Sequence, residues 1–327
     1  NGLTITKAGI DRCGDSCGAP QAISDILLIG SAAAGGATAN LMRSADAGLT
    51  WAATAADPHA IGCNLVSVRA FMVNNTTVRY LVLRATLAAT ALQIAYSDDA
   101  GATWVTVNLG ATVAEAGVGD QSLMVLDEKD MWACTGGGRV YKSINGAVTW
   151  TEQPSALTAS GAAALNAIHF VDENVGFAVG AAGLNIYTID GGTNWAAATA
   201  TGALALNSVQ VISRYRVIAG GATGSLYQTW NGGVTWTAIT GWVGAGAGAV
   251  KNIKFANELV GFMVVDTAAS VGWLFRTIDG GANWLRITNP LVNTGLNAIV
   301  LTGFGLNSVF GAGNAVGALQ YVLKASG

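Results

Sequence analysis

Short apolar runs separated by turn-forming residues follow one another along the whole chain. The segment Leu3–Ala8 alternates apolar and polar residues as a strand does. Similar strand-like segments begin with Asn at four later places: Asn166–Phe170, Asn207–Val211, Asn252–Phe255 and Asn297–Val300. The longest uncharged runs, such as Ile26–Met42, are interrupted by Gly, Ser, Thr and Asn, which fits strands and loops better than a bilayer helix. The pattern predicts an all-β protein without a transmembrane segment.

A turn motif, [Ser/Thr]-x-[Asp/Asn]-x-Gly-x-[Thr/Asn]-Trp, recurs between the apolar runs, with Ala147 replacing Gly in one copy. It combines a side-chain oxygen that can accept turn N–H groups with a residue that tolerates positive φ, so we expect a tight hairpin turn. The Trp brings a large apolar surface to the next strand. The expected turn residues are Asp46, Asp99, Asn145, Asp190, Asn231 and Asp279, and the packing residues are Trp51, Trp104, Trp150, Trp195, Trp236 and Trp284.

The spacing of the motif predicts the architecture. Successive motif Trp residues lie 41 to 53 residues apart, a period typical of propeller blades, and 327 residues hold about seven such units. We therefore expect one domain, residues 1–327, forming a seven-bladed β-propeller of four-stranded antiparallel blades. The C-terminal unit stops before its turn and outer strand. We expect the N-terminal strand near residues 3–8 to complete it and close the ring, followed by a loop over residues 9–22.

The repeats resemble Asp-box, or BNR, repeats, which occur in sialidases, sortilin-type receptors and the photosystem II assembly factor family. One whole blade, Asn166–Asp172 with Val175–Gly180 and Leu184–Trp195, resembles the last of these families. That resemblance implies a propeller and, as one functional alternative, an assembly factor that binds a membrane-protein client. The family typically carries an arginine patch on one face, whereas Arg is scattered along this sequence.

Composition favours a protein partner. With 16 Lys and Arg against 19 Asp and Glu, the net charge is −3, and no basic stripe is present that would neutralise nucleic-acid phosphates. Only 11% of residues are charged, against roughly 25–35% on a free soluble surface. We expect neighbouring subunits to cover much of the surface. The predicted function is a structural or binding subunit of an extracellular or virion-type assembly, such as a phage tail, fibre or capsid decoration.

Enzymatic activity is not expected. A sialidase needs an arginine cluster, a Tyr/Glu nucleophile pair and an acid on the inner strands, but the main polar residues expected there are Arg69, His169, Gln210 and Lys254. A glycoside hydrolase needs two carboxylates at a defined separation, and the available ones, Asp127, Asp172 and Glu173, resemble loop residues. A glycan-binding or sialidase-like propeller is kept as an alternative, with a glycan as the alternative partner.

The sequence predicts no cofactor and no metal. Most turn motifs offer one carboxylate, whereas calcium needs about six to eight oxygens from a concentrated loop. We expect Cys13 and Cys17 to form a disulfide within the N-terminal loop, or one of them to pair with Cys63. A zinc site that adds His59 to these cysteines is the alternative. Cys134 lies in a strand pattern and is expected to be buried.

Overall fold

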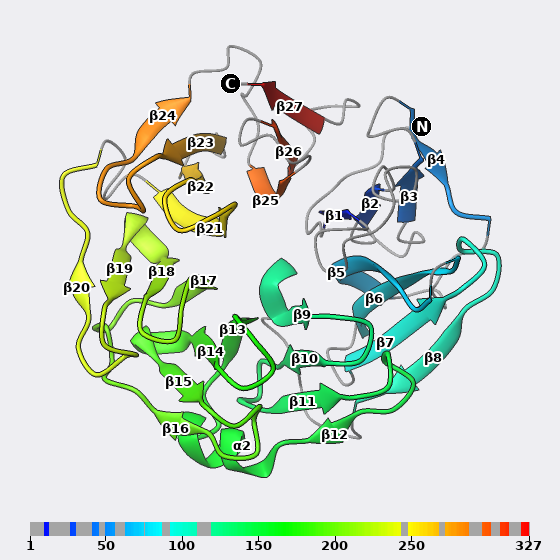
Figure 1. Cartoon of the computed structure of the whole chain (residues 1–327), viewed down its shortest axis with the longest axis horizontal. Helices are drawn as coiled ribbons and strands as arrows, with labels where there is room; N and C mark the ends of the chain where they lie inside the picture. The colour runs from blue at the N-terminus through cyan, green and yellow to red at the C-terminus, as the bar shows by residue number, and fades with distance from the viewer. Residues whose placement is uncertain are drawn as a thin grey trace.

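The computed structural model is a ring of β-sheets, each a simple antiparallel meander, arranged around a central axis (Figure 1). It describes residues 10–12, 27–30, 41–45, 50–55, 63–74, 76–86, 92–109, 119–242, 248–267, 272–287, 296–301, 308–313 and 322–326. Within these residues the strands form six four-stranded sheets and one three-stranded sheet. The prediction of an all-β, seven-bladed propeller is confirmed.

The first three blades contain four strands each. Blade 1 consists of β1 (Ile10–Arg12), β2 (Leu27–Gly30), β3 (Leu41–Ser44) and β4 (Ala52–Ala53). Blade 2 consists of β5 (Cys63–Met72), β6 (Val78–Thr86), β7 (Leu92–Ser97) and β8 (Val105–Asn108). Blade 3 follows the 3-10 helix η1 (Asp120–Ser122) and consists of β9 (Leu123–Val125), β10 (Met131–Cys134), β11 (Val140–Ser143) and β12 (Thr151–Glu152).

The α-helix α2 (Pro154–Ser160) leads into the last four blades. Blade 4 has β13 (Leu165–Phe170), β14 (Gly176–Gly180), η2 (Ala181–Gly183), β15 (Asn185–Thr188) and β16 (Ala196–Ala197). Blade 5 has β17 (Leu206–Val211), β18 (Val217–Gly221), η3 (Ala222–Gly224), β19 (Leu226–Thr229) and β20 (Thr237–Ala238). Blade 6 has β21 (Gly248–Phe255), β22 (Gly261–Thr267), β23 (Gly272–Thr277) and β24 (Leu285–Ile287), and blade 7 has β25 (Leu296–Leu301), β26 (Ser308–Gly313) and β27 (Val322–Ser326).

The ring is closed at blade 7, because β25 contacts β21 on one side and β1 on the other. Blade 7 and blade 1 accordingly lie next to each other in the ring of Figure 1. The predicted closing strand near residues 3–8 lies outside the described residues. The predicted loop 9–22 was wrong at Ile10–Arg12, which pair with β2 as the innermost strand of blade 1. A strand of three residues is too short to show an alternating pattern in the sequence. This strand can be recognised only from its pairing with the neighbouring strand.

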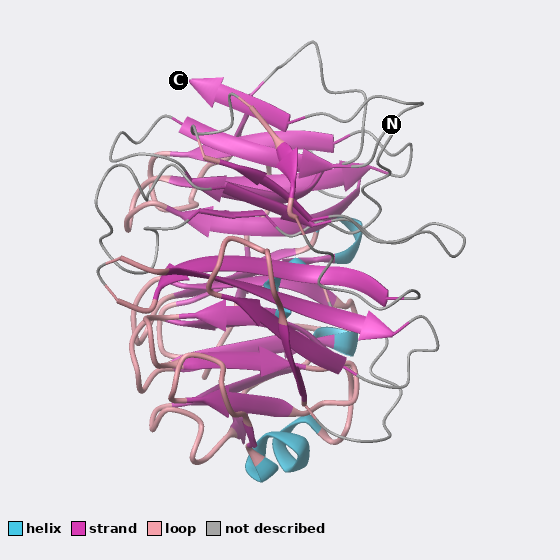
Figure 2. Cartoon of the chain, turned by 90° about the vertical axis from the view of Figure 1, so that its right-hand side faces the viewer, coloured by secondary structure: helices cyan, strands magenta, loops and turns pink. Residues whose placement is uncertain are grey.

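Burial falls from the second strand of a blade to its outer strand. Every residue of β14 and β18 is buried, whereas both residues of β16 and of β20 are exposed. The side view in Figure 2 shows the sheets stacked face to face around the ring. A second strand is covered on both faces by adjacent blades and needs apolar or small residues throughout. The outer strands β16 and β20 face solvent and carry Ala and Thr.

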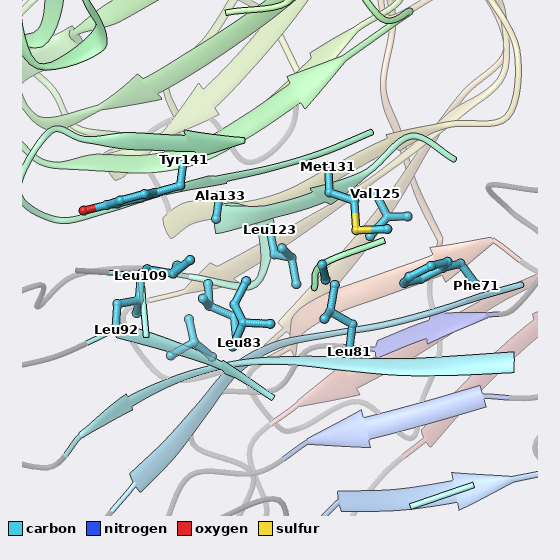
Figure 3. Packing of buried hydrophobic residues seen from close by; sticks show 13 residues of the cluster. Phe71, Leu81, Leu83, Leu92, Leu109, Leu123, Val125, Met131, Ala133 and Tyr141 are labelled. Atoms are coloured by element: carbon cyan, nitrogen blue, oxygen red, sulfur yellow. The ribbon is translucent and has the colours of Figure 1, made fainter. Parts of the chain in front are cut away.

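The core consists of apolar layers between adjacent blades. Figure 3 shows the layer between blades 2 and 3, where Leu81 and Leu83 of β6 face Leu123 and Met131. Fully burying one such side chain contributes about 1.5–3 kcal/mol. The layer between blades 3 and 4 contains a Trp132–Phe170 stack with ring centroids 3.7 Å apart. Each blade therefore depends on its neighbours. No helix of the described residues is long and apolar enough to span a membrane.

Candidate functional site

The turn motif forms a closed set of local hydrogen bonds, seen in blade 4. The Thr188 hydroxyl donates to Asp190 Oδ1 (2.9 Å) and accepts the backbone N–H of Gly192 (2.9 Å). The same Asp190 oxygen accepts the Asn194 backbone N–H at 2.8 Å. Gly191 and Gly192 have φ of +71° and +94°, the left-handed region that glycine adopts most easily. Two further donors of the turn bond outside it: the Gly191 N–H donates to the Asn174 carbonyl at 2.9 Å, and the Trp195 N–H donates to Ser155 Oγ at 3.1 Å.

The same arrangement occurs in blades 2, 3, 5 and 6, around Asp99, Asn145, Asn231 and Asp279. In the two Asn copies the amide nitrogen donates to a Thr hydroxyl two positions before the strand, Thr149 or Thr235, at 2.8 Å. Asp46 of the first copy lies outside the described residues. Ala147 adopts φ +73° where the other copies have glycine, so blade 3 holds an alanine in the left-handed region.

The turn carboxylates are engaged as acceptors. Hydrogen bonds from Thr103, first from its side chain and then from its backbone, lower the pKa of Asp99 to about 2. For Asp190 and Asp279 desolvation raises the pKa, but hydrogen bonds from Asn194 and Asn283 outweigh it and the net shift is downward. A carboxylate with a depressed pKa and occupied oxygens is a poor general acid. These residues stabilise turns.

The motif indoles pack against aromatic rings. Trp195 meets Phe170, Trp236 meets Phe177 and Trp284 meets Phe255, each nearly edge-to-face with centroids 5.9 to 6.4 Å apart. The indole N–H of Trp150 donates to the carbonyl of Ala147 at 3.2 Å. Trp51 and Trp104 are half-buried. The motif Trp therefore joins a surface turn to the interblade core.

We call one end of the ring the turn face: loops 126–130, 171–175, 212–216 and 256–260 together with motif turns 143–150, 188–195, 229–236 and 277–284. Loop and turn of the same blade are tied together; for example, the Gly232 N–H donates to the Tyr215 carbonyl at 2.9 Å. The preceding blade also donates to these turns, as when Trp132 Nε1 bonds the Gly191 carbonyl at 3.2 Å. The turn face is thus a rigid surface spanning several blades.

Apolar side chains are exposed at matching positions on the turn face. The second residue of the motif is Ile144, Ile189, Trp230 and Ile278 in blades 3 to 6, exposed by 67%, 54%, 61% and 61%. Val148 and Val234, also motif residues, and the loop residues Tyr215 and Leu259 are exposed as well. The motif treats the second residue as variable, so sequence reasoning missed this band. The signal was present, because that residue is apolar in four successive blades.

Blade 5 differs from its neighbours on this face. The Arg216 guanidinium lies 4.2 Å from the centroid of the Trp230 ring, and Arg214 lies 5.9 Å from that of Tyr215. Arg216 also donates to the blade 6 carbonyls of Glu258, at 2.9 Å, and Gly280. Burial lowers the pKa of Arg216, against the opposing effect of Glu258. The arginine is thereby fixed beneath an exposed indole.

The central axis is crossed by η1, visible at the middle of Figure 1. Gln121 accepts the Val209 N–H at 3.1 Å and donates to the Ile253 carbonyl at 3.2 Å, which ties it to blades 5 and 6. Asp120 pairs with the buried Arg69 of blade 2 at 3.2 Å. A segment between blades 2 and 3 therefore connects opposite sides of the ring, which the sequence did not indicate.

The polar residues expected on the inner strands do lie there: Arg69 on β5, His169 on β13, Gln210 on β17 and Lys254 on β21. Desolvation within the ring, together with the positive charges of Lys254 and Arg69, lowers the pKa of His169 to about 3. The imidazole is therefore neutral at pH 7. These residues form one polar group around the axis, distinct from the turn face.

Of the remaining candidate residues, Asp127 and Asp172 lie in loops of the turn face. Asp127 Oδ1 accepts the N–H groups of Lys129 and Asp130, and Asp172 Oδ1 accepts two N–H groups in the next blade. Both lie in loops, as expected. Cys134 is buried in β10. Cys13, Cys17 and His59 lie outside the described residues, as does the side chain of Cys63, so the disulfide and zinc hypotheses stay predictions.

No protein-family model matches the sequence, and no curated protein matches it. Solved structures resemble its fold. YCF48 from Cyanidioschyzon merolae has a TM-score of 0.65 at 15% identity, covering 100% of this chain and 98% of that one. A structure of YCF48 bound to D1 peptide has a TM-score of 0.68 at 14% identity, covering 100% of this chain and 93% of that one. A GH74 xyloglucanase from Xanthomonas campestris gives 0.69 at 13% identity, covering 96% of this chain and 51% of the enzyme. At these identities the likeness concerns the fold.

Proposed function

We propose that this chain is a non-catalytic, protein-binding β-propeller that docks its partner on the turn face. The observation that carries the proposal is the band of exposed apolar residues at repeat-equivalent positions in blades 3 to 6. Apolar side chains grouped on one surface mark interaction sites on soluble proteins. The band rests on turns that are closed by their own hydrogen bonds, so docking requires little ordering of the backbone.

Blade 5 supplies the expected anchor. Trp, Tyr and Arg are the residue types enriched at the energetic centres of protein interfaces, and Trp230, Tyr215 and Arg214 bring all three together. Arg216 supports one face of the indole and leaves Trp230 61% exposed. A band across four blades also exceeds what stacking on a single sugar ring needs. These features favour a protein over a glycan.

Two settings fit a protein-binding propeller. One is a structural subunit of an extracellular or virion-type assembly, which stays a prediction from composition. The other is an assembly factor for a membrane-protein client, supported by the similarity in fold to YCF48 bound to D1 peptide. The likeness to a GH74 enzyme favours a glycan role less, because the loop carboxylates of Asp127 and Asp172 are engaged by backbone N–H groups.

Photo-crosslinking tests the proposal. A benzophenone amino acid placed at Trp230 and irradiated in the native source is expected to form a covalent adduct with a partner protein, identified by mass spectrometry. The matched control places it at Leu204, which is 39% exposed in the loop that joins blades 4 and 5 at the opposite end of the ring. Light scattering on the isolated chain shows whether the partner is a second copy.

Binding measurements with the identified partner complete the test. Trp230→Ala is expected to weaken binding at least tenfold, whereas Leu204→Ala leaves it unchanged, because truncation at an interface centre costs about 2 kcal/mol or more. Equal crosslinking from both positions, or unchanged binding by Trp230→Ala, would contradict docking on the turn face.

A further inference from the structure

Two of the turn motifs contain the dipeptide Asn-Gly. Asn145 precedes Gly146 in blade 3, and Asn231 precedes Gly232 in blade 5, whereas the turns of blades 2, 4 and 6 carry Asp at this position. Both asparagines are exposed to solvent. Asparagine is a thermolabile residue, and a following glycine makes it more so, because no side chain keeps the glycine nitrogen away from the asparagine amide. These two turns are therefore candidate sites of spontaneous deamidation.

Deamidation at such a site is an intramolecular reaction that needs only water. The glycine backbone nitrogen loses its proton and attacks Cγ of the asparagine, the bond from Cγ to Nδ2 breaks, and ammonia leaves. Nucleophile and amide belong to adjacent residues, so the ring closes without an encounter between separate molecules. Water then opens the cyclic imide. Hydrolysis of the bond between the glycine nitrogen and Cγ gives aspartate, and hydrolysis of the bond between that nitrogen and the main-chain carbonyl carbon gives isoaspartate.

The turn of blade 3 has hydrogen bonds that suit an aspartate. Asn145 Oδ1 accepts the Thr149 backbone N–H at 2.9 Å, and Asn145 Nδ2 donates to the Thr149 hydroxyl at 2.8 Å. In blade 2, Asp99 accepts both the backbone N–H and the hydroxyl of Thr103, at 2.8 Å and 2.6 Å. A hydroxyl can donate or accept, so Thr149 only has to turn its hydrogen toward the new carboxylate. Isoaspartate instead lengthens the backbone and shortens the side chain, which moves the oxygen away from the Thr149 N–H.

The glycine nitrogen is held less closely in blade 3 than in blade 5. The Gly146 N–H donates to the Lys129 carbonyl at 3.4 Å. The Gly232 N–H donates to the Tyr215 carbonyl at 2.9 Å, the commonest length for such a bond. A short hydrogen bond keeps the proton on the nitrogen and holds the nitrogen in place. Attack on the preceding amide is therefore opposed more strongly at Gly232 than at Gly146.

The amide that is attacked follows the same order. Asn145 Oδ1 accepts the Ser143 hydroxyl at 3.1 Å, and Asn231 Oδ1 accepts the Thr229 hydroxyl at 2.9 Å. We propose that Asn145 deamidates spontaneously in the folded chain, faster than Asn231, and that its turn directs the product toward aspartate. Each event adds one negative charge to the turn face, beside the exposed Ile144. The proposal does not depend on docking at that face, and either proposal can fail alone.

Peptide mapping by mass spectrometry provides the test. The folded chain is aged at mildly alkaline pH and digested with a protease that works in acid, so that the digestion itself causes little deamidation. Asn145 is expected to react several times faster than Asn231. Equal rates, a faster Asn231, or no reaction at Asn145 over a period in which the unfolded chain reacts would overturn the proposal.

Ageing in urea is the control for the role of the fold. Both asparagines are followed by glycine, so in the unfolded chain their rates should be similar. A rate ratio in urea as large as that in the folded chain would show that the hydrogen bonds of the two turns do not cause the difference.

Variants identify the aged species. Asn145→Gln places the amide further from the glycine nitrogen, so the acidic species that ion-exchange chromatography separates from the aged chain should be largely lost. The matched variant Asn231→Gln should keep that species. Asn145→Asp should elute with it from the start. Persistence of the same species in Asn145→Gln, or a different elution of Asn145→Asp, would contradict the assignment.

The ratio of the two products tests the direction of ring opening. An isoaspartyl methyltransferase labels isoaspartate and not aspartate, so it measures the isoaspartate share in the Asn145 peptide. This share should be lower after ageing of the folded chain than after ageing in urea, because opening toward aspartate keeps the Thr149 N–H bonded. Equal shares would show that the turn does not direct the product.

Discussion

Blades 4 and 5 have the same backbone and opposite surface chemistry. Their strands match in length and register, and both turns close through a Thr hydroxyl, Thr188 or Thr229, that accepts a glycine N–H. On the turn face, however, blade 4 exposes Asp172, Glu173 and Asp190. Blade 5 instead carries Arg214, Tyr215, Arg216 and Trp230 there.

The difference shows which positions of the repeat are free to vary. Hydrogen-bonding and glycine positions are fixed by backbone geometry, whereas the second motif residue and exposed loop residues such as Tyr215 contact mainly solvent. Function can therefore change from blade to blade without altering the fold. Substitutions at the shared positions should cost similar stability in both blades, and those at the variable positions should change only the surface.

The largest loss of stability is expected on substituting the glycine that ends the second strand of each blade. A Cβ at Gly180 would lie 1.8 Å from the Ala164 carbonyl oxygen, and one at Gly221 would lie 2.0 Å from that of Ala205. Because backbone must move in either case, Gly180→Ala and Gly221→Ala should each destabilise by about 3 kcal/mol or more. Urea unfolding measures this cost, which should be similar in the two blades.

Gly161→Ala is the control for these glycines. No atom lies within 4 Å of a Cβ at Gly161, and only its φ of +61° opposes alanine. That conformation costs about 1–2 kcal/mol. If Gly180→Ala were no more destabilising than Gly161→Ala, close backbone approach would not be the constraint that blades 4 and 5 share.

A smaller effect is expected at the turn hydroxyls. Thr188 and Thr229 are buried, and each accepts the glycine N–H and donates to the Asp or Asn of its turn. Thr188→Ala and Thr229→Ala leave a buried N–H unpaired, so each should lose about 1–3 kcal/mol. Thr→Ser keeps the oxygen and should lose less, as measured by thermal unfolding. Equal stability of the Ala and Ser variants would contradict the role of the hydroxyl.

The sequence was sufficient for local features and insufficient for contacts between distant residues. The turn around Asp190 is closed by residues within four positions, so its pattern could be recognised directly. The contact of Gln121 with Ile253 joins residues 132 positions apart, and no periodicity encodes it. The exposure of Trp230 also depends on the fold, because the same residue type is buried at Trp195. Strand β1 was missed because it has no recognisable pattern of its own and is a strand only through its pairing with β2.

The smallest expected effect is a difference between the two turns in how much stability they lose in acid. Asp190 has a pKa below 3.8 in the folded chain, so its stabilising contribution is present above pH 3.8 and is lost as the pH falls through the folded value. In blade 5 the equivalent residue is Asn231, which does not titrate, so the stability contribution of that turn does not change in acid. Asp190→Asn should make the fall in unfolding midpoint shallower in acid.

The reverse exchange, Asn231→Asp, should introduce the same acid sensitivity into blade 5. Thr235 would donate to the new carboxylate from its backbone and hydroxyl, as Thr103 does to Asp99, whose pKa is about 2. The unfolding midpoint of this variant, followed from pH 6 to acid, should fall more steeply than that of the wild type, and parallel curves would contradict the prediction. Both turns keep the same Thr and Gly hydrogen bonds. A difference in unfolding midpoint that appears only at acid pH would therefore be due to the carboxylate alone.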